Sequence, residues 1–440
     1  MVHVIPPTTQ TYAASLLCAV IIVLALPLLA ACILIVERKI MAETAARHDA
    51  ANSGFHSLLQ PIADAVKLIL QKDSAPTSVD RLVFWVAPLI SMLVALLAFS
   101  VLPVGPAFQI ADVNVGLLFI LGIVSLGIYG LFLGDWASNH QHSPSSALCR
   151  ADVLVSYQIA GILGLISALL LAGSLSMREI VQSQLDQGQW FLFYVPVGFV
   201  IYFIGSLVAT NHAPVESLDG TRKIVDEQTT EYSGFRWFLH FLTEYTNMII
   251  FAGVATTVFL GGWLRPLASY RDRFPGSSIE LLDVMPVVVV AGIAVYCFRR
   301  ALKQPVKIRR TGTWYVGGTY AFAAVVLAAS WFAPEAFMQG VHGAFWFLVK
   351  AGGYIYCLLR VCFMFPRLRL GFSTQLAWRV LVPVACVNLI TVAVAILTAQ
   401  DTGLPMRLTT ILSTLVALAI AWWLSRNSAD IPGVLATDGE

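Results

Sequence analysis

Proton-exchanging side chains gather in the stretch from Thr210 to Glu244, which is polar although long apolar segments flank it. Its acids are Glu216, Asp219, Asp226, Glu227, Glu231 and Glu244, and the last stands at the mouth of the next apolar run. His212 adds a group that titrates near neutral pH. A charged side chain inside a bilayer costs about 3 kcal/mol. Acids kept beside apolar runs therefore indicate a role in proton transfer or in binding a polar ligand.

A second group of charges follows the first apolar run. Glu37 and Arg38 end that run, Arg47 follows in the next loop, and Asp64 and Lys67 lie further on. The segment holding the last two places its apolar residues at helical spacing and these two charges on the opposite side. It is too short to cross a bilayer, so we expect an amphipathic helix that lies in the membrane interface.

The composition places the chain in a membrane. Of its 440 residues, 58% are hydrophobic and only 12% are charged, whereas soluble domains carry about 25% charged residues. The net charge of +2 is near zero, which argues against nucleic-acid binding. The seven cysteines include no Cys-x-x-Cys pair, so we expect no iron–sulfur ligation. His140 and His142 have no third ligand in view, so we expect no metal site.

Apolar runs of about 20 residues, the length that crosses the hydrocarbon core, recur along the chain. They span 13–36, 84–102, 115–134, 158–174, 191–209, 246–263, 284–298, 315–333, 343–365, 377–398 and 409–425. We therefore predict an all-α integral membrane protein, in which residues 1–440 form a single polytopic bundle of about 11 transmembrane helices plus the interfacial helix.

The distribution of Lys and Arg predicts the orientation. Most of them fall in one set of alternate loops and few in the other. By the positive-inside rule, the N-terminus lies outside and the C-terminus lies in the cytoplasm of a bacterial plasma membrane. The loop 37–83 with its interfacial helix and the acidic loop 210–245 then face the cytoplasm. Residues 284–333 hold a basic loop between two apolar runs and look like an inserted pair of helices.

Several short motifs follow one another in a family's order. They are Glu37-Arg38-Lys39, Leu58-Leu59-Gln60-Pro61-Ile62-Ala63-Asp64-Ala65-Val66-Lys67-Leu68, Trp136-Ala137-Ser138-Asn139, Leu171-Ala172-Gly173-Ser174-Leu175-Ser176, Glu231-Tyr232-Ser233-Gly234, Glu244-Tyr245 and Gly261-Gly262-Trp263, with a looser match at Pro366-Arg367-Leu368-Arg369 and Trp378-Arg379. Together they resemble the H-type membrane subunit of the proton-translocating NADH:quinone oxidoreductase, respiratory complex I. The second and fifth motifs carry most of the specificity.

The resemblance implies a tilted helix bundle that docks other membrane and peripheral subunits and forms part of a chamber for a lipid quinone. It implies quinone as the substrate, membrane lipids as further partners, no cofactor bound by this subunit, and no catalysis by the subunit alone. Buried acids would couple quinone reduction to proton translocation. The residues that it places at the chamber or in proton coupling are Glu37, Arg38, Arg47, Asp64, Lys67, His212, Glu231, Tyr232 and Glu244.

The chain departs from this family at two acids. Gln158 stands where the family has a membrane-embedded glutamate, and Ala209 stands where it has a second one. Arg222 and Lys223 also fill a stretch in which the family carries several glutamates. An amide and a methyl group do not exchange protons as a carboxylate does, so we expect an altered proton path.

Two other interpretations stay open at this point. The chain is alternatively the membrane anchor subunit of a related membrane-bound hydrogenase or another complex without NADH input. In a different class, it is a stand-alone transporter or a structural membrane scaffold. Neighbouring genes and co-purifying subunits after mild detergent extraction distinguish these alternatives.

Overall fold

The fold is known from a computed structural model. It describes residues 9–44, 63–72, 75, 79–106, 108–137, 143–210, 232–265, 279–302, 318, 320–321, 324–325, 335–364, 370–402, 409–411, 413–417 and 419–420. The predicted all-α class is confirmed, because every regular element in these ranges is a helix or a helical turn.

The helices follow the apolar runs of the sequence. They are α1 (Thr9–Thr44), α4 (Arg81–Ser100), α5 (Gly116–Ala137), α6 (Ser143–Ala172), α7 (Met177–Gln187), the 3-10 turn η1 (Phe191–Phe193), α8 (Pro196–Ala209), α10 (Gly234–Phe259), α11 (Ile279–Leu302), α13 (Glu335–Met364), α14 (Leu370–Leu376), the π-helical turn η4 (Ala377–Leu381) and α15 (Val382–Thr402). The predicted interfacial helix is helical over residues 63–70.

Five stretches in the described part of the chain are long and apolar enough to cross a membrane. They are Arg81–Ser100, Gly116–Gly134, Ala151–Ala172, Gly340–Met364 and Ser373–Thr402. The larger count of about 11 transmembrane helices stays a prediction. The run 191–209 differs from expectation, because its helix begins only at Pro196 and has 14 residues. Proline favours the first turn of a helix, where its missing N–H is not needed.

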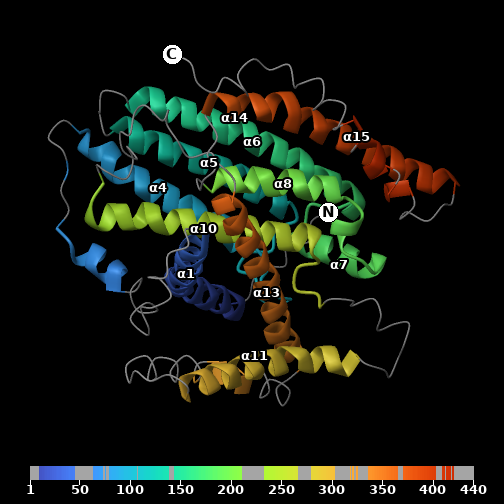
Figure 1. The fold of residues 1–440 in the computed structure, drawn as a ribbon, viewed down its shortest axis with the longest axis horizontal. Coiled ribbons are helices and arrows are strands. Elements are labelled where there is room, and N and C mark those ends of the chain that lie inside the picture. The colour runs from blue at the N-terminus through green and yellow to red at the C-terminus, as the bar shows by residue number, and fades with distance from the viewer. Residues whose placement is uncertain are drawn as a thin grey trace.

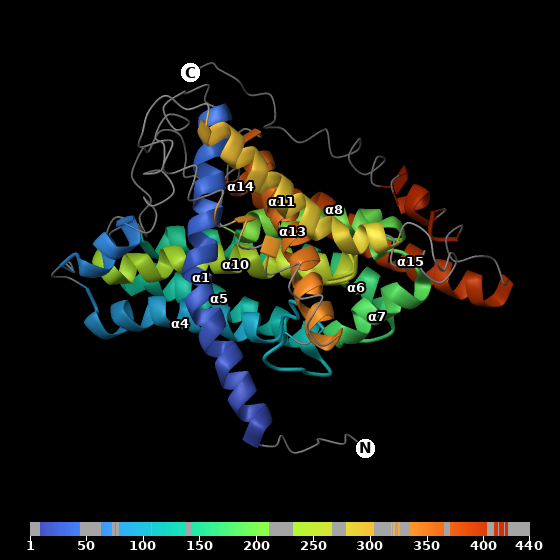
Figure 2. The ribbon, with the colours of Figure 1, turned by 90° about the horizontal axis from the view of Figure 1, so that it is seen from below.

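Helices α4, α5, α6, α8 and α10 run along the long axis of the molecule in both ribbon views (Figures 1 and 2). Neighbours in this layer are α4 with α5, α5 with α6, and α6 with α8, while α10 packs on α4 and also reaches α8 and α6. Helix α1 crosses the layer steeply (Figure 2). The second half of α10 is almost wholly buried, so this helix lies at the centre of the core.

Helices α6 and α8 approach closely because glycines lie where they meet. A Cβ atom added at Gly164 would lie 2.8 Å from the carbonyl oxygen of Gly198, and one added at Gly198 would lie 2.9 Å from that of Gly164. Small residues allow such backbone contact between membrane helices, where the hydrophobic effect does not drive helices together. The contact sets the distance between side chains further along α6 and α8.

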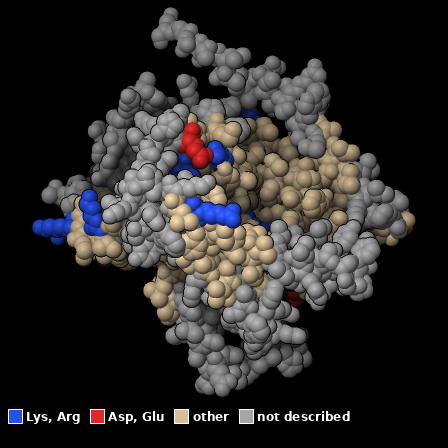
Figure 3. Space-filling model, turned by 60° about the horizontal axis from the view of Figure 1, so that its bottom comes forward, with Lys and Arg blue, Asp and Glu red and all other residues tan. Residues whose placement is uncertain are grey.

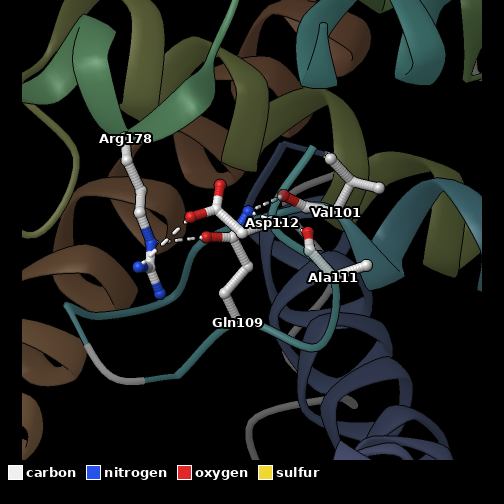
Figure 4. Close-up of polar contacts among 5 residues, drawn as sticks. All are labelled: Val101, Gln109, Ala111, Asp112 and Arg178. Atoms are coloured by element: carbon white, nitrogen blue, oxygen red, sulfur yellow. Dashed lines mark hydrogen bonds and ion pairs between the residues drawn. The ribbon is translucent and has the colours of Figure 1, made fainter. Parts of the chain in front are cut away.

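Polar contacts tie the loop between α4 and α5 to α7 (Figure 4). Arg178 donates from Nε to the side-chain oxygen of Gln109 at 2.8 Å and pairs with Asp112 at 3.3 Å. Gln109 in turn donates to the carbonyl oxygens of Val101 at 2.9 Å and Ala111 at 3.0 Å. This network closes the end of the bundle opposite the start of α10.

The described surface carries few charges. On the face drawn in Figure 3, most described residues are neither acidic nor basic, and the Lys, Arg, Asp and Glu side chains form a few small groups. Large apolar side chains such as Leu24, Leu82 and Leu118 are exposed on α1, α4 and α5. Exposed apolar side chains over several helices are what a lipid-facing surface requires.

Candidate functional site

Two cavities bring the sequence-predicted residues together. The first, which we call the interfacial pocket, is a partly open space of about 260 Å³ between α1, the helix 63–70 and the start of α10. Its lining residues are Leu34, Arg38, Asp64, Ala65, Lys67, Leu68, Gln71, Trp237, Phe238 and Phe241. One wall of the pocket is therefore charged and the other is aromatic.

The charged wall is held by an ion pair between elements far apart in the sequence. Arg38, at the end of α1, lies 3.3 Å from Asp64 on the short helix, and both side chains are about half exposed. Such an exposed pair contributes at most about 1 kcal/mol, so it orients the two helices more than it stabilises them. Ala65 and Leu68 of the same short helix pack against the apolar cluster that contains Phe238 and Tyr245 of α10.

Glu37 lies deeper and joins α1 to α10. The hydroxyl group of Tyr245 donates to the Glu37 carboxylate at 2.5 Å. Tyr245 is 4% exposed and stacks at an angle on Phe241, a residue of the pocket wall. The carboxylate of Glu37 therefore lies behind the aromatic wall, and Tyr245 connects it to Phe241, which lines the pocket.

Tyr232 is buried at the start of α10. Its ring stacks flat on Phe84 of α4, with ring centroids 4.0 Å apart. The Arg236 guanidinium lies over the same Phe84 ring at 4.6 Å and is 3% exposed. The aromatic faces attract the guanidinium charge electrostatically, and this attraction acts where water is excluded. The motif that contains Tyr232 thus anchors α10 on α4.

The second cavity, which we call the central cavity, is a partly open space of about 40 Å³ between α4, α5, α6, α8 and α10. Gln158 and Ala209, the two positions at which the sequence resemblance leads us to expect acids, line it together with Glu244. Polar side chains share the lining: Ser91, Thr210, His240, Thr243 and Asn247. Gln158 donates to the hydroxyl group of Ser125 at 2.8 Å. Hydroxyl and amide groups of this kind can hold water in a low-dielectric space.

Gln158 and Ala209 also line a neighbouring, mostly apolar cavity of about 30 Å³ between α5, α6, α8 and α10. The two positions therefore stand on the wall between both spaces. Carboxylates at these positions would border an apolar cavity on one side and a polar cavity on the other.

Three of the predicted site residues are not placed by the structure. Arg47, His212 and Glu231 lie outside the described residues. Of the others, Arg38, Asp64 and Lys67 meet at the interfacial pocket, and Glu37 lies close behind it. Tyr232 packs on Phe84 of α4. Glu244 lines the central cavity together with Gln158 and Ala209.

Sequence reasoning missed three residues that the structure brings into view. Tyr245 binds Glu37, His240 lines the central cavity, and Lys350 of α13 donates to three backbone carbonyls. His240 lies four residues before Glu244, the spacing that puts two side chains on one helix face. That spacing was a usable signal for His240. The other two contacts join distant segments and have no local signature.

Fold and cavities together define a class: a helical membrane protein that carries charged and polar groups in cavities between its helices. The family model described as "NADH dehydrogenase" matches residues 17–393. The chain is 38% identical to the second H-type subunit of NADH-quinone oxidoreductase from Solibacter usitatus over 384 residues, which cover 86% of this chain and 95% of that protein.

Two further relatives are named as the same type of subunit. The first H-type subunit of Koribacter versatilis is 35% identical over 81% of this chain and 86% of its own length, and the H-type subunit of Chlorobaculum tepidum is 32% identical over 81% and 85%. The chain therefore belongs to the NADH dehydrogenase family, as a homologue of the H-type subunit of NADH-quinone oxidoreductase. Its relatives are membrane subunits of an enzyme complex whose name gives quinone as the substrate.

Proposed function

We propose that this chain is the membrane subunit that forms part of the quinone chamber of an NADH:quinone oxidoreductase and helps to couple quinone reduction to proton translocation. The interfacial pocket is the observation that carries the proposal. Its charged residues Arg38, Asp64 and Lys67 face its aromatic residues Trp237, Phe238 and Phe241. A lipid quinone has a polar ring and an apolar tail, so it needs both kinds of wall.

The coupling part of the proposal rests on the acids around this pocket. Glu37 lies behind the aromatic wall through Tyr245, and Glu244 is the residue before Tyr245 on α10. A charge change at a quinone in the pocket would act on the lining residues Arg38, Asp64 and Lys67 and, behind the aromatic wall, on Glu37. Helix α10, which carries Tyr245, also carries Glu244, and Glu244 lines the central cavity. Because Gln158 and Ala209 line that cavity, its proton path differs from a chain of carboxylates.

Phe241→Ala tests the quinone site, because it removes an aromatic wall and leaves the charges in place. In the assembled complex, the KM for a short-chain quinone should rise about tenfold, the loss of roughly 1.4 kcal/mol of aromatic contact. NADH oxidation with ferricyanide, which bypasses quinone, should not change. The matched control is Phe193→Ala, since Phe193 is exposed on η1 at the opposite end of the bundle. An unchanged KM in Phe241→Ala would contradict a quinone site in this pocket.

The orientation and the partners belong to the same proposal. We place the start of α10, the helix 63–70 and the end of α1 on the cytoplasmic side, where peripheral subunits dock and membrane lipids surround the apolar faces. The positive-inside distribution of Lys and Arg supports this placement. The aspartate and arginine network around Arg178 would then lie on the outer side.

A further inference from the structure

We propose that His240 is a proton-exchanging residue of the central cavity and works with Glu244 in place of the two carboxylates missing at Gln158 and Ala209. The inference rests on the proposed coupling function and names the group that carries its altered step. It follows from which side chains the fold places around one cavity.

The cavity contains two titratable groups among its described lining residues, His240 and Glu244. Both lie on α10 four residues apart, so they share one face of the helix, with Cβ atoms about 5–6 Å apart. Gln158 comes from α6 and Ala209 from the end of α8. The imidazole therefore reaches the space that the missing carboxylates would border.

The imidazole is fixed in place by its neighbours. Tyr232 meets the His240 ring edge to face, with ring centroids 4.8 Å apart and planes at 71°. Both ring nitrogens are buried. Gly134 of α5 lies beside both rings: a Cβ atom there would lie 3.3 Å from the Tyr232 hydroxyl, a tight contact, and 3.8 Å from Cε1 of His240, an ordinary one. A fixed ring orientation keeps the imidazole in the lining of the cavity.

The charges and titratable groups around His240 come mainly from its own helix. Arg236 lies one turn before it and Glu244 one turn after it, and Tyr232 contacts it directly. From the other elements around the cavity, the described lining residues that carry polar side chains are Ser91 of α4, Gln158 of α6 and Thr210 after α8, and none of these titrates near neutral pH. His240 is thus placed between a cation and an acid.

The proposed step moves one proton and changes no covalent bond between heavy atoms. Neutral His240 takes a proton on a ring nitrogen and becomes imidazolium. The imidazolium then gives that proton to the Glu244 carboxylate, directly or through water in the cavity, and returns to the neutral form. Imidazole suits this role because its ordinary pKa lies close to neutral pH, so both forms are accessible. The polar lining of Thr243 and Asn247 can hold the water that such a relay uses.

The test uses the whole complex reconstituted in vesicles, with electron transfer to quinone and proton uptake measured together from pH 5.5 to 8.5. His240→Phe and His240→Gln should each lower the rate of proton translocation at least about tenfold, because a positioned proton-transfer group contributes roughly 10²- to 10⁴-fold. The wild-type pH profile should show a step that both variants lack. His342→Phe is the matched control, since His342 lies on α13 and not at this cavity.

Rescue by carboxylates separates proton exchange from packing. The triple variant His240→Phe, Gln158→Glu, Ala209→Glu should regain translocation, with a pH profile different from that of the wild type. All variants are compared at equal amounts of assembled complex. Wild-type translocation and pH profile in His240→Phe would overturn the inference. So would a loss in His240→Phe that the restored carboxylates do not recover, because that loss would show a structural role.

Glu244→Gln distinguishes the failure of this inference from failure of the proposed function. If Glu244→Gln abolishes translocation while His240→Phe does not, only the role of His240 is wrong. If neither Glu244→Gln nor Phe241→Ala alters quinone reduction or translocation, the proposed function itself fails. Loss in both Glu244→Gln and His240→Phe, with rescue of the latter, supports the relay.

Discussion

Lys350 is an ammonium group on an apolar helix, and backbone oxygens surround it. Its Nζ atom donates to the carbonyl oxygens of Leu260 at 2.7 Å, Gly262 at 3.0 Å and Leu264 at 2.5 Å. The same atom lies over the Trp190 ring at 4.7 Å. These carbonyls lie in the turn that follows the end of α10 at Phe259. One side chain therefore fixes the end of α10 to α13.

Replacing Lys350 by methionine should destabilise the protein by about 2–4 kcal/mol, because buried carbonyls lose their donor. The measurement is the thermal midpoint at which the detergent-solubilised complex loses this chain. Lys39→Met makes the same chemical change at an exposed position of α1 and should leave the midpoint unchanged. An equal midpoint in both variants would mean that water or other groups replace the ammonium without cost.

At the scale of elements, the spacing of α6 and α8 decides how the central cavity is shaped. Gly164 and Gly198 let the two helices touch through their backbones. Gln158 lies on α6 and Ala209 ends α8, so both positions move with this contact. Gly205, about two helical turns after Gly198 on α8, repeats the close approach, since a Cβ atom there would lie 3.0 Å from the carbonyl oxygen of Tyr157.

Gly198→Ala should force α6 and α8 apart, because the new methyl group would lie 2.5 Å from Oγ of Ser167 and 2.9 Å from the Gly164 oxygen. Overpacking of this kind costs about 1–3 kcal/mol. The yield of assembled complex and its thermal midpoint should both fall. Gly122→Ala is the control, since an added Cβ atom there meets nothing within 4 Å. If both variants behave alike, the α6–α8 contact is not tight enough to constrain the cavity.

At the scale of the whole molecule, the proposed orientation puts the interfacial pocket inside and the Arg178 network outside. Single cysteines in a cysteine-free background test it with a membrane-impermeant thiol reagent on intact cells. Gln182→Cys, exposed on α7, should be labelled directly. Lys72→Cys, exposed beyond the helix 63–70, should be labelled only after permeabilisation. The reverse pattern would refute the orientation and place the pocket on the outer face.

Membrane class and helix positions were accessible from local sequence. Long apolar runs must satisfy their backbone groups as helices in lipid, and α4, α5, α13 and α15 lie close to their predicted runs. The amphipathic pattern before α4 also predicted the helix that the structure shows over 63–70. The ends of the helices were less predictable. Helix α8 begins at Pro196, after a 3-10 turn, because chain geometry and packing override hydropathy there.

The sequence by itself determined that this chain is a helical membrane protein, and its ordered motifs pointed to the family that the comparisons show. Hydropathy, periodicity and motif order are local properties, so they can be read along the chain. Tertiary structure alone decided that Tyr245 meets Glu37, and that Gln158, Ala209, His240 and Glu244 surround one cavity. Those contacts depend on the angles at which the helices cross and on the depth at which each helix lies in the bundle. Both are set by the packing of side chains from many distant residues.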